Sequence, residues 1–298
     1  MFHTDKNKIA GRLFEANQYL EPTANQNCYY PNNSPHKELR GKYPRKYQID
    51  PSWSKTAPNP SDPPLSPDGI QQAKELGTYI ASLQPRITHI YASPFVRTIQ
   101  TALEVVKLVN KDYSTPDQIV KVLIEPGFAE FYVSNPEWTE ANIFRTLDQL
   151  SEIVPNRDYF NEDYRSVFDA KYYLDLKIES RERLRDRLKR VLQKILDAHK
   201  DDCNILIVTH AAALIEGVRA FITLSKEEQM KITATDENTK ALTWDMTSVR
   251  PGVCSLTHFE FLDDKWNLKT SGLTSYLSKG EQRVWVFPDD ETIDTQRK

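Results

Sequence analysis

The stretch of sequence that most constrains the fold is an apolar run interrupted by one histidine. It reads Ile205-Leu-Ile-Val-Thr-His-Ala-Ala-Ala-Leu214. Four consecutive apolar residues, partly β-branched, are typical of a strand buried on both faces, and the segment from Ala211 predicts the start of a helix. We therefore expect His210 at the carboxyl end of a strand. Ligands of open α/β sheets bind at that edge, where helix N-termini favour anions. The alternative is a turn histidine without a function.

A second unit, from His89 to Ala102, has the same order of strand, Ser-Pro break and helix. We expect a strand from Ile87 to Ala92, with Ser93 as the helix cap and Pro94 at the first helical position. Arg97 would then lie in the first helical turn, aimed back over the end of the strand. Taken alone, this arginine would be interpreted as a surface residue of an amphipathic helix.

Four motifs together resemble those of the histidine phosphatase superfamily, which includes the phosphoglycerate mutases. The first two motifs are S-P-x-x-R-x-x-Q-T-A and L-I-V-T-H-A. Glu125-Pro-Gly-Phe-Ala-Glu130 is similar to the family's E-P-G-x-x-E-W, and Asp62–Leu76 is similar to D-x-P-L-(S/T)-x-x-G-x-x-Q-A. The subgroup with the small tau subunit of transcription factor IIIC and its cytosolic fungal relatives is most similar. Its signals are Cys254-Ser-Leu256, Trp266-x-Leu268 and the segment from Gly272 to Trp285.

The resemblance implies a three-layer α/β sandwich with a mostly parallel central sheet and helices on both faces. It also implies hydrolysis of a phosphomonoester through a phosphohistidine. By that comparison Arg97 holds the phosphoryl group, His210 is the second histidine of the phosphate pocket, and Glu130 is the general acid. The resemblance requires no metal or organic cofactor. The implied partner is a phosphorylated small molecule or a phosphoprotein.

The nucleophilic histidine is the part of the family pattern that this sequence lacks. The family places it in R-H-G-x-R after an apolar first strand, and no R-H-G occurs in the chain. We expect the corresponding position near Arg40-Gly-Lys-Tyr-Pro-Arg45, where Arg45 could stand for the motif's second, phosphate-binding arginine and Lys42 lies near the histidine position. The upstream histidines, His3 and His36, have no apolar strand to present them.

We accordingly expect the whole first strand to be missing and residues 1–45 to form a divergent or poorly ordered segment. A histidine-phosphatase-like domain should follow over residues 46–287, and a disordered tail over 288–298. Two explanations stay open. Residues 1–45 are a divergent or incorrect start joined to an enzyme domain, or the protein is an inactive pseudophosphatase that acts as an interaction or scaffold protein, linked to transcription factor IIIC.

Composition limits the chain to one sizeable core, since its 298 residues are 39% hydrophobic and 27% charged. A formal net charge of -3 gives no reason to expect direct nucleic-acid binding. The 3 cysteines lack C-x-x-C spacing, which favours neither a zinc site nor disulfides and predicts an intracellular protein, cytoplasmic or nuclear. The sequence shows neither an apolar run long enough for a membrane span nor a signal peptide.

Helices are expected at residues 67–83, 94–109 and 180–200. The last has a basic face that we interpret as solvated, with an acidic partner or nucleic acid as the alternative; it carries Arg181, Arg183, Arg185, Arg187, Lys189 and Arg190. The aromatic region from Phe131 to Tyr173 supplies candidate specificity residues, each also explained as core: Trp138, Tyr159 and Tyr164. A strand at 253–261 would make His258 a structural residue.

Overall fold

The computed structural model describes residues 9–15, 62–113, 115, 118–131, 143–154, 157–176, 179–199, 203–225, 231–232, 249, 251–262, 265–282, 285 and 287. For residues 9–15, 222–225, 231–232, 262 and 265–267 it describes the backbone alone.

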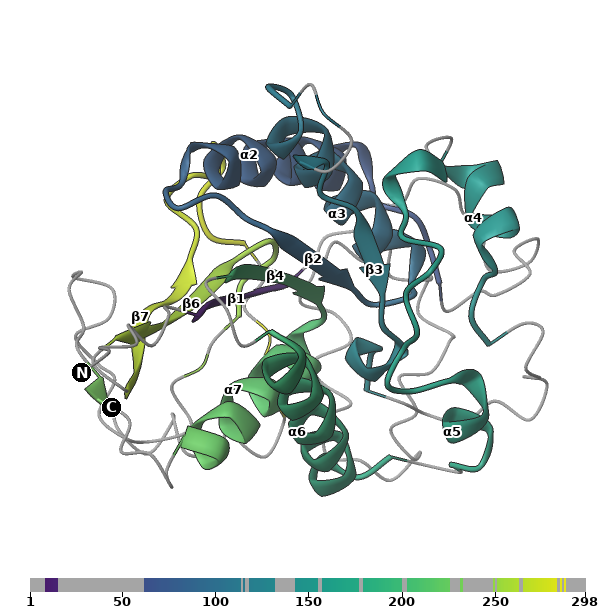
Figure 1. Ribbon diagram of the computed structural model, residues 1–298, viewed down its shortest axis with the longest axis vertical. Coiled ribbons are helices and arrows are strands. Elements are labelled where there is room, and N and C mark those ends of the chain that lie inside the picture. Colours follow the sequence, from purple (N-terminus) through teal and green to yellow (C-terminus); the bar gives the residue numbers. More distant parts are fainter. Residues whose placement is uncertain are drawn as a thin grey trace, which may run out of the picture.

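A seven-stranded mixed sheet forms the centre of the molecule, in the order β3-β2-β4-β1-β6-β7-β5 (Figure 1). The parallel part consists of β3, β2, β4 and β1, while β6 is antiparallel to both of its neighbours, β1 and β7. β5 pairs with β7 in parallel. The strands are β1 (Ile9–Glu15), β2 (His89–Ala92), β3 (Val122–Ile124), β4 (Cys203–Thr209), β5 (Lys231–Ile232), β6 (Leu256–Leu262) and β7 (Lys265–Leu273).

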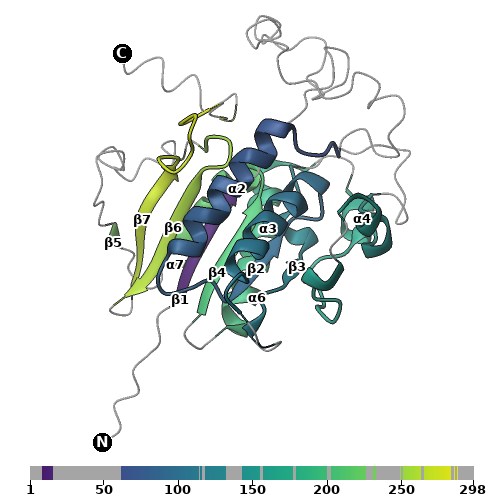
Figure 2. The ribbon, with the colours of Figure 1, turned by 90° about the horizontal axis from the view of Figure 1, so that it is seen from above.

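Helices cover both faces of this sheet, which confirms the predicted three-layer α/β class. α2 (Pro67–Ser82) and α3 (Val96–Val109) lie on one face, and α6 (Arg181–Ala198) and α7 (Ala211–Ser225) lie on the other (Figures 1 and 2). The three predicted helices are found within two residues of their expected bounds. The described residues also form four short helical elements: α4 (Leu147–Ile153), α5 (Ala170–Leu174) and the 3-10 helices η3 (Pro126–Phe128) and η4 (Arg157–Tyr159).

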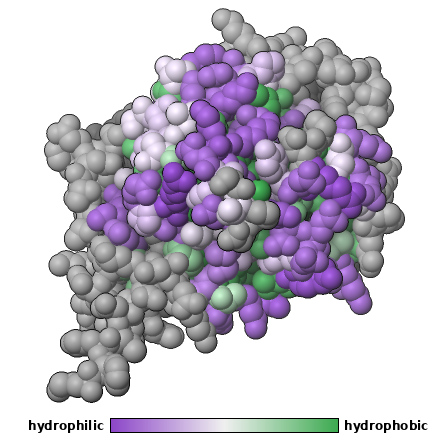
Figure 3. Space-filling model, turned by 45° about the horizontal axis from the view of Figure 1, so that its top comes forward, coloured by the Kyte–Doolittle hydropathy of each residue, from purple (hydrophilic) through white to green (hydrophobic). Residues whose placement is uncertain are grey.

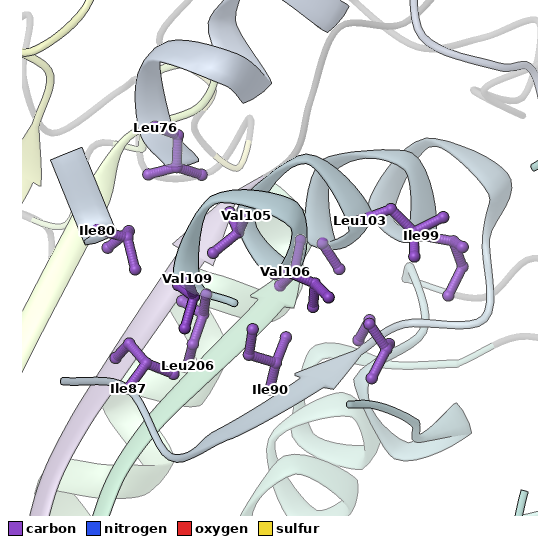
Figure 4. Close-up of a cluster of buried hydrophobic side chains, with 14 of the residues drawn as sticks. Leu76, Ile80, Ile87, Ile90, Ile99, Leu103, Val105, Val106, Val109 and Leu206 are labelled. Atoms are coloured by element: carbon purple, nitrogen blue, oxygen red, sulfur yellow. The ribbon is translucent and has the colours of Figure 1, made fainter. Parts of the chain in front are cut away.

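The core beneath α2 and α3 is an aliphatic layer against β2 and β4 (Figure 4). α3 buries an almost continuous set of apolar side chains, and the strands contribute Ile90 and Leu206 from below. The two helices approach closely at Gly77, where an added Cβ would lie 2.9 Å from the Glu104 carbonyl oxygen. Glycine at this position allows both helices to bury their apolar faces in the same layer.

On the opposite face, α6 packs its predicted apolar stripe against α7 and the sheet. The buried residues recur at helical spacing and include Leu184, Leu188, Val191, Leu192 and Ile195. Ser180 caps the helix by accepting a hydrogen bond from the N–H of Arg183 at 3.3 Å. This unit fixes the position of α7, which begins directly after His210.

The expectation that the first strand is missing is wrong. β1 lies in the middle of the sheet between β4 and β6, with Glu15 opposite Thr209 and Phe14 opposite Leu256. Its backbone gives both neighbours the hydrogen-bond partners that a gap would have removed. The sequence Ile-Ala-Gly-Arg-Leu-Phe-Glu contains glycine and two charged residues, so it lacks the apolar run typical of a buried parallel strand. The predicted tail at 288–298 lies outside the described residues.

The coloured part of the face shown in Figure 3 is mainly hydrophilic, with hydrophobic side chains visible only in small areas. Among the described residues, the large hydrophobic side chains counted as exposed are Ile119 and Ile153, each only slightly more than one-third exposed. None of the described helices has both the length and the hydropathy needed to cross a membrane.

Candidate functional site

The candidate site lies where β2 and β4 end side by side. Ala92, the last residue of β2, is paired with Val208, and the next N–H, that of Ser93, donates to the Val208 carbonyl at 2.9 Å. His210 follows β4 directly and precedes α7. The predicted position of His210 at the carboxyl end of a strand is therefore confirmed.

The turn from β2 into α3 differs from the prediction. α3 begins at Val96 rather than Pro94, and Phe95 is its cap residue, without a side-chain cap among the described residues. Ser93 was expected to cap the helix, but it is buried and its Oγ lies 2.7 Å from Nε2 of His210. The N–H of Val96 donates instead to Oδ1 of Asp62 at 2.7 Å. A carboxylate distant in sequence thus accepts a hydrogen bond from the first N–H of α3, which has no partner within the helix.

Three residues singled out from the sequence come together at this edge. Nη2 of Arg97 lies 3.1 Å from Nδ1 of His210 and 3.6 Å from Oε2 of Glu130. The same Glu130 oxygen is 3.5 Å from Nδ1 of His210. The side chains of Arg97 and His210 are only 1% and 0% exposed, whereas that of Glu130 is 20% exposed. A cation, an imidazole and a carboxylate therefore share one largely buried point.

Phe95 packs against two of these groups. The guanidinium carbon of Arg97 lies 4.6 Å from the centre of the Phe95 ring, and the same ring makes an edge contact with His210 at 5.2 Å. The aromatic face favours the guanidinium charge and limits the positions open to both side chains. Motif matching did not single out Phe95.

The sequence analysis also assigned no role to Asp62 and Arg145. Oδ1 of Asp62 lies 3.8 Å from Nη1 of Arg97, and Oδ2 lies 3.3 Å from Nε of Arg145. Burial raises the pKa of Asp62, an effect opposed by the positive charges of both arginines. Asp62 opens the D-x-P-L motif, which was the signal available for it. Arg145 lies in the aromatic region from Phe131 to Tyr173, where no motif marks it.

The surroundings of His210 favour its uncharged form. Complete burial and the nearby positive charges of Arg97 and Arg187 place the pKa of His210 well below its usual value. A neutral imidazole has one nitrogen that donates and one that accepts. Of the pair Arg97 and His210, it is therefore Arg97 that can donate hydrogen bonds from a charged group.

A buried ion pair supports the loop that carries Glu130. Arg187, on α6, contacts Glu179 through Nε and Nη2, both at 2.8 Å. Its Nη1 donates to the carbonyl oxygens of Gly127 and Ala129 at 2.9 and 3.1 Å, and its Nη2 reaches the Glu130 carbonyl at 3.4 Å. The interpretation of Arg187 as part of a solvated basic face is wrong, because this side chain is 0% exposed.

Two more arginines of the predicted basic face are also engaged in ion pairs. Arg181 and Arg185 both contact Glu216 on α7, at 3.0 and 2.7 Å, and Arg219 contacts the same carboxylate. The Glu216 side chain is completely buried. Two of the six basic residues of the predicted face therefore join α6 to α7, and Arg183 and Arg190 are exposed.

Glu125 joins the start of η3 to the residues just before α5. Oε1 accepts from the N–H of Gly127 at 2.7 Å, while Oε2 accepts from the Tyr164 hydroxyl at 2.6 Å and from the N–H of Val167 at 2.7 Å. The Tyr164 ring also packs edge-on against Tyr91 at 5.6 Å. Tyr164 thus has structural contacts that account for its position.

Of the remaining residues singled out from the sequence, Tyr159 and His258 lie within the described residues. Tyr159 is partly buried and packs against the core beneath α3, which agrees with its alternative interpretation as a core residue. The others lie outside the described residues: Arg45, Lys42, His3, His36 and Trp138. His258 lies in β6, as expected for a strand histidine.

Known proteins give independent comparisons for this arrangement. The family model for the histidine phosphatase superfamily (branch 1) matches residues 50–274. The transcription factor tau 55 kDa subunit of Saccharomyces cerevisiae is 25% identical over 249 residues, which cover 76% of this chain and 52% of the yeast protein. Human ubiquitin-associated and SH3 domain-containing protein A is 28% identical over 228 residues, covering 71% of this chain and 32% of the human protein. The chain thus spans about half or less of the length of these relatives.

A solved structure shows the same fold. The ecdysone phosphate phosphatase of Bombyx mori, crystallised in complex with tungstate, superposes with a TM-score of 0.58 at 19% identity. The match covers 92% of this chain and 96% of the silkworm chain. Since the family model also covers most of the sequence, the chain belongs to the histidine phosphatase superfamily, branch 1.

Proposed function

We propose that this protein binds the phosphoryl group of a phosphorylated small molecule or phosphoprotein at Arg97 and His210. The observation that carries the proposal is the 3.1 Å contact between Nη2 of Arg97 and Nδ1 of His210, at the carboxyl edge of the parallel strands. A guanidinium group matches the charge and geometry of phosphoryl oxygens. Burial strengthens the interaction because little water screens the charges.

Glu130 is the candidate general acid of this site. It is the most exposed of the three converging side chains and lies within 3.6 Å of Arg97 and 3.5 Å of His210. An acid that protonates a leaving oxygen must reach the substrate side of the phosphoryl group, which fits a partly exposed position. Arg187 holds the backbone of its loop.

Catalysis would require a nucleophile that the sequence does not supply in the family's form. β1 ends at Glu15, level with Thr209, which immediately precedes His210. The sequence after β1 continues Ala16-Asn-Gln-Tyr-Leu20, without histidine. We therefore propose hydrolysis through a phosphohistidine only on the condition that another histidine acts as the nucleophile. Arg45 is proposed as a further phosphate ligand.

Vanadate binding, measured by isothermal titration calorimetry, tests the proposed site. Arg97→Ala removes a charge-assisted contact of about 1.5–3 kcal/mol, so binding should weaken by roughly 10- to 150-fold. Arg183→Ala is the matched control, because Arg183 is an exposed arginine of α6. Equal vanadate affinity in the wild type and Arg97→Ala would contradict the proposal.

A second function, an interaction protein without catalysis, is favoured by one pair of observations. The chain lacks R-H-G and is 25% identical over 249 residues to the yeast tau 55 kDa subunit, which is named as part of a transcription factor. A nuclear location would accompany this role, and a cytoplasmic one would accompany a metabolic phosphatase. Affinity purification of the tagged chain from its own cells tests the alternative, with co-purification of the other transcription factor IIIC subunits as the supporting result.

A further inference from the structure

The hydrogen bonds around His210 assign its tautomer. Nη2 of Arg97 can only donate, and it lies 3.1 Å from Nδ1 of His210, so Nδ1 must accept with its lone pair. The single proton of the neutral ring is then on Nε2. That nitrogen lies 2.7 Å from Oγ of Ser93, to which it donates. Burial and the neighbouring arginine charges, which lower the pKa of His210, agree with a ring that holds one proton.

This tautomer has a consequence for any oxyanion bound by Arg97. The oxyanion oxygens would occupy the donors of Arg97 and approach Nδ1, whose lone pair repels negative charge. Adding a proton to Nδ1 changes the nitrogen from an acceptor into a charged donor, which is the stronger partner for an oxyanion. Nε2 keeps its proton and its bond to Ser93 in both states.

We propose that Ser93 is a positioning residue that holds Nε2 of His210, and that an oxyanion binds together with one proton taken up from solvent at Nδ1. The proton balance is simple: neutral His210, one proton and a dianion give an imidazolium beside the dianion. The proposal rests on the oxyanion site proposed above. It adds a role for Ser93 and a coupling between ligand binding and protonation.

The charged groups facing His210 explain why the two events are coupled. Arg97 on α3 and Arg187 on α6 oppose protonation of the ring, whereas Glu130, 3.5 Å from Nδ1, favours it. Asp62 is 3.8 Å from Arg97 and acts on the ring through that arginine. A bound oxyanion compensates the positive charges of Arg97 and Arg187, which oppose protonation of His210. It therefore favours the charged imidazolium form of the ring.

Nitrogen NMR of the histidine-labelled protein tests the assignment directly. His210 is identified by the signal lost in His210→Asn. In the free protein we expect the tautomer with the proton on Nε2, and with saturating sulfate we expect both nitrogens to be protonated. Sulfate is the probe because it stays a dianion from about pH 5 to 8, where histidine titrates. A free-state proton on Nδ1 would overturn the proposal.

Calorimetric titration with sulfate, repeated in buffers of different ionisation enthalpy, measures how many protons the protein takes up on binding. At about pH 7.5 the wild type should take up close to one proton per sulfate bound. Ser93→Ala should weaken sulfate binding roughly tenfold and move the uptake to lower pH, because the imidazolium loses its hydrogen-bond acceptor. Ser93→Thr, which keeps the hydroxyl, should restore both properties. Thr88→Ala is the matched control, since its hydroxyl contacts a different histidine, His89, at 2.9 Å.

The outcomes separate the two proposals. Absence of sulfate and vanadate binding in the wild type contradicts the oxyanion site itself. Binding without proton uptake, or with the same pH profile in Ser93→Ala, leaves that site standing and overturns the inference. If Glu130→Gln no longer takes up a proton on sulfate binding while the NMR signal of His210 is unchanged, the proton belongs to Glu130. This result also overturns the inference.

Discussion

Asp62 and Arg145 form an ion pair, with 3.3 Å between Oδ2 and Nε, that joins the segment before α2 to the segment before α4. The other oxygen of the same carboxylate accepts from Val96 and lies 3.8 Å from Arg97. One buried carboxylate therefore contacts both arginines of the candidate site. An oxyanion that binds Arg97 must compete with it.

Asp62→Asn should tighten oxyanion binding. The amide oxygen can still accept from the N–H of Val96, but the negative charge near Arg97 is gone. We expect sulfate affinity to rise about three- to tenfold at low ionic strength, measured by calorimetry, and the gain to shrink in salt. Asp68→Asn, at an α2 carboxylate paired with the surface Lys279, is the control. Weaker sulfate binding by Asp62→Asn would show that its charge positions Arg97 and does not compete with the ligand.

The chain should have little or no phosphatase activity on an aryl phosphate. Electrostatic stabilisation by Arg97 and His210 cannot replace a histidine that attacks phosphorus, and attack by water leaves only a small rate. His210→Ala should then change turnover little. Release of the aryl alcohol, followed by absorbance, measures this. Robust turnover with a trapped phosphohistidine refutes it, and peptide mapping of the label would identify the nucleophile.

Arg187→Met should destabilise the protein by about 3–5 kcal/mol, because Glu179 becomes a buried charge without its cation. Urea unfolding followed by circular dichroism gives the free energy. The double variant Arg187→Met with Glu179→Leu should recover much of the loss, since two apolar side chains can replace a buried pair. If the double variant is less stable than Arg187→Met, the unpaired charge of Glu179 is not the cause of the loss, and the prediction is wrong.

Acid should destabilise the fold partly through His89. Burial and His199, whose ring centre is 4.0 Å away, lower the pKa of His89 to about 4. The folded state then binds fewer protons than the unfolded state, so this contribution to stability is complete above pH 6.5 and is lost as the pH falls from 6.5 toward 4. Urea unfolding at several pH values should show a smaller slope in this range for His89→Gln. Identical slopes would contradict the prediction.

Most of the architecture was accessible from the sequence because short motifs coincide with structural transitions. L-I-V-T-H-A marks the end of β4 and the start of α7, and the motif from Asp62 to Leu76 runs into α2. β1 was not accessible. A strand that combines glycine, arginine and glutamate has no clear period, and its place in the sheet depends on pairing with residues far along the chain.

The candidate site was predictable for residues that belong to motifs, and the structure places Arg97, Glu130 and His210 together. Their partners were less accessible. The position of Ser93 favoured a helix cap, and only the fold shows that its hydroxyl contacts His210. The position of Arg145 depends on how the region from Phe131 to Tyr173 folds, and the local sequence pattern does not determine that.

The central position of β1 also determines the order in which the sheet can be completed during synthesis. β1 is made before the other described strands of the sheet, but its neighbours are Cys203–Thr209 on one side and Leu256–Leu262 on the other. Contacts of such long sequence separation slow folding, because the intervening chain must be closed into a loop before any pairing compensates for the lost entropy. Until then the edge of β4 is open to pairing with other chains, which exposes the nascent protein to aggregation.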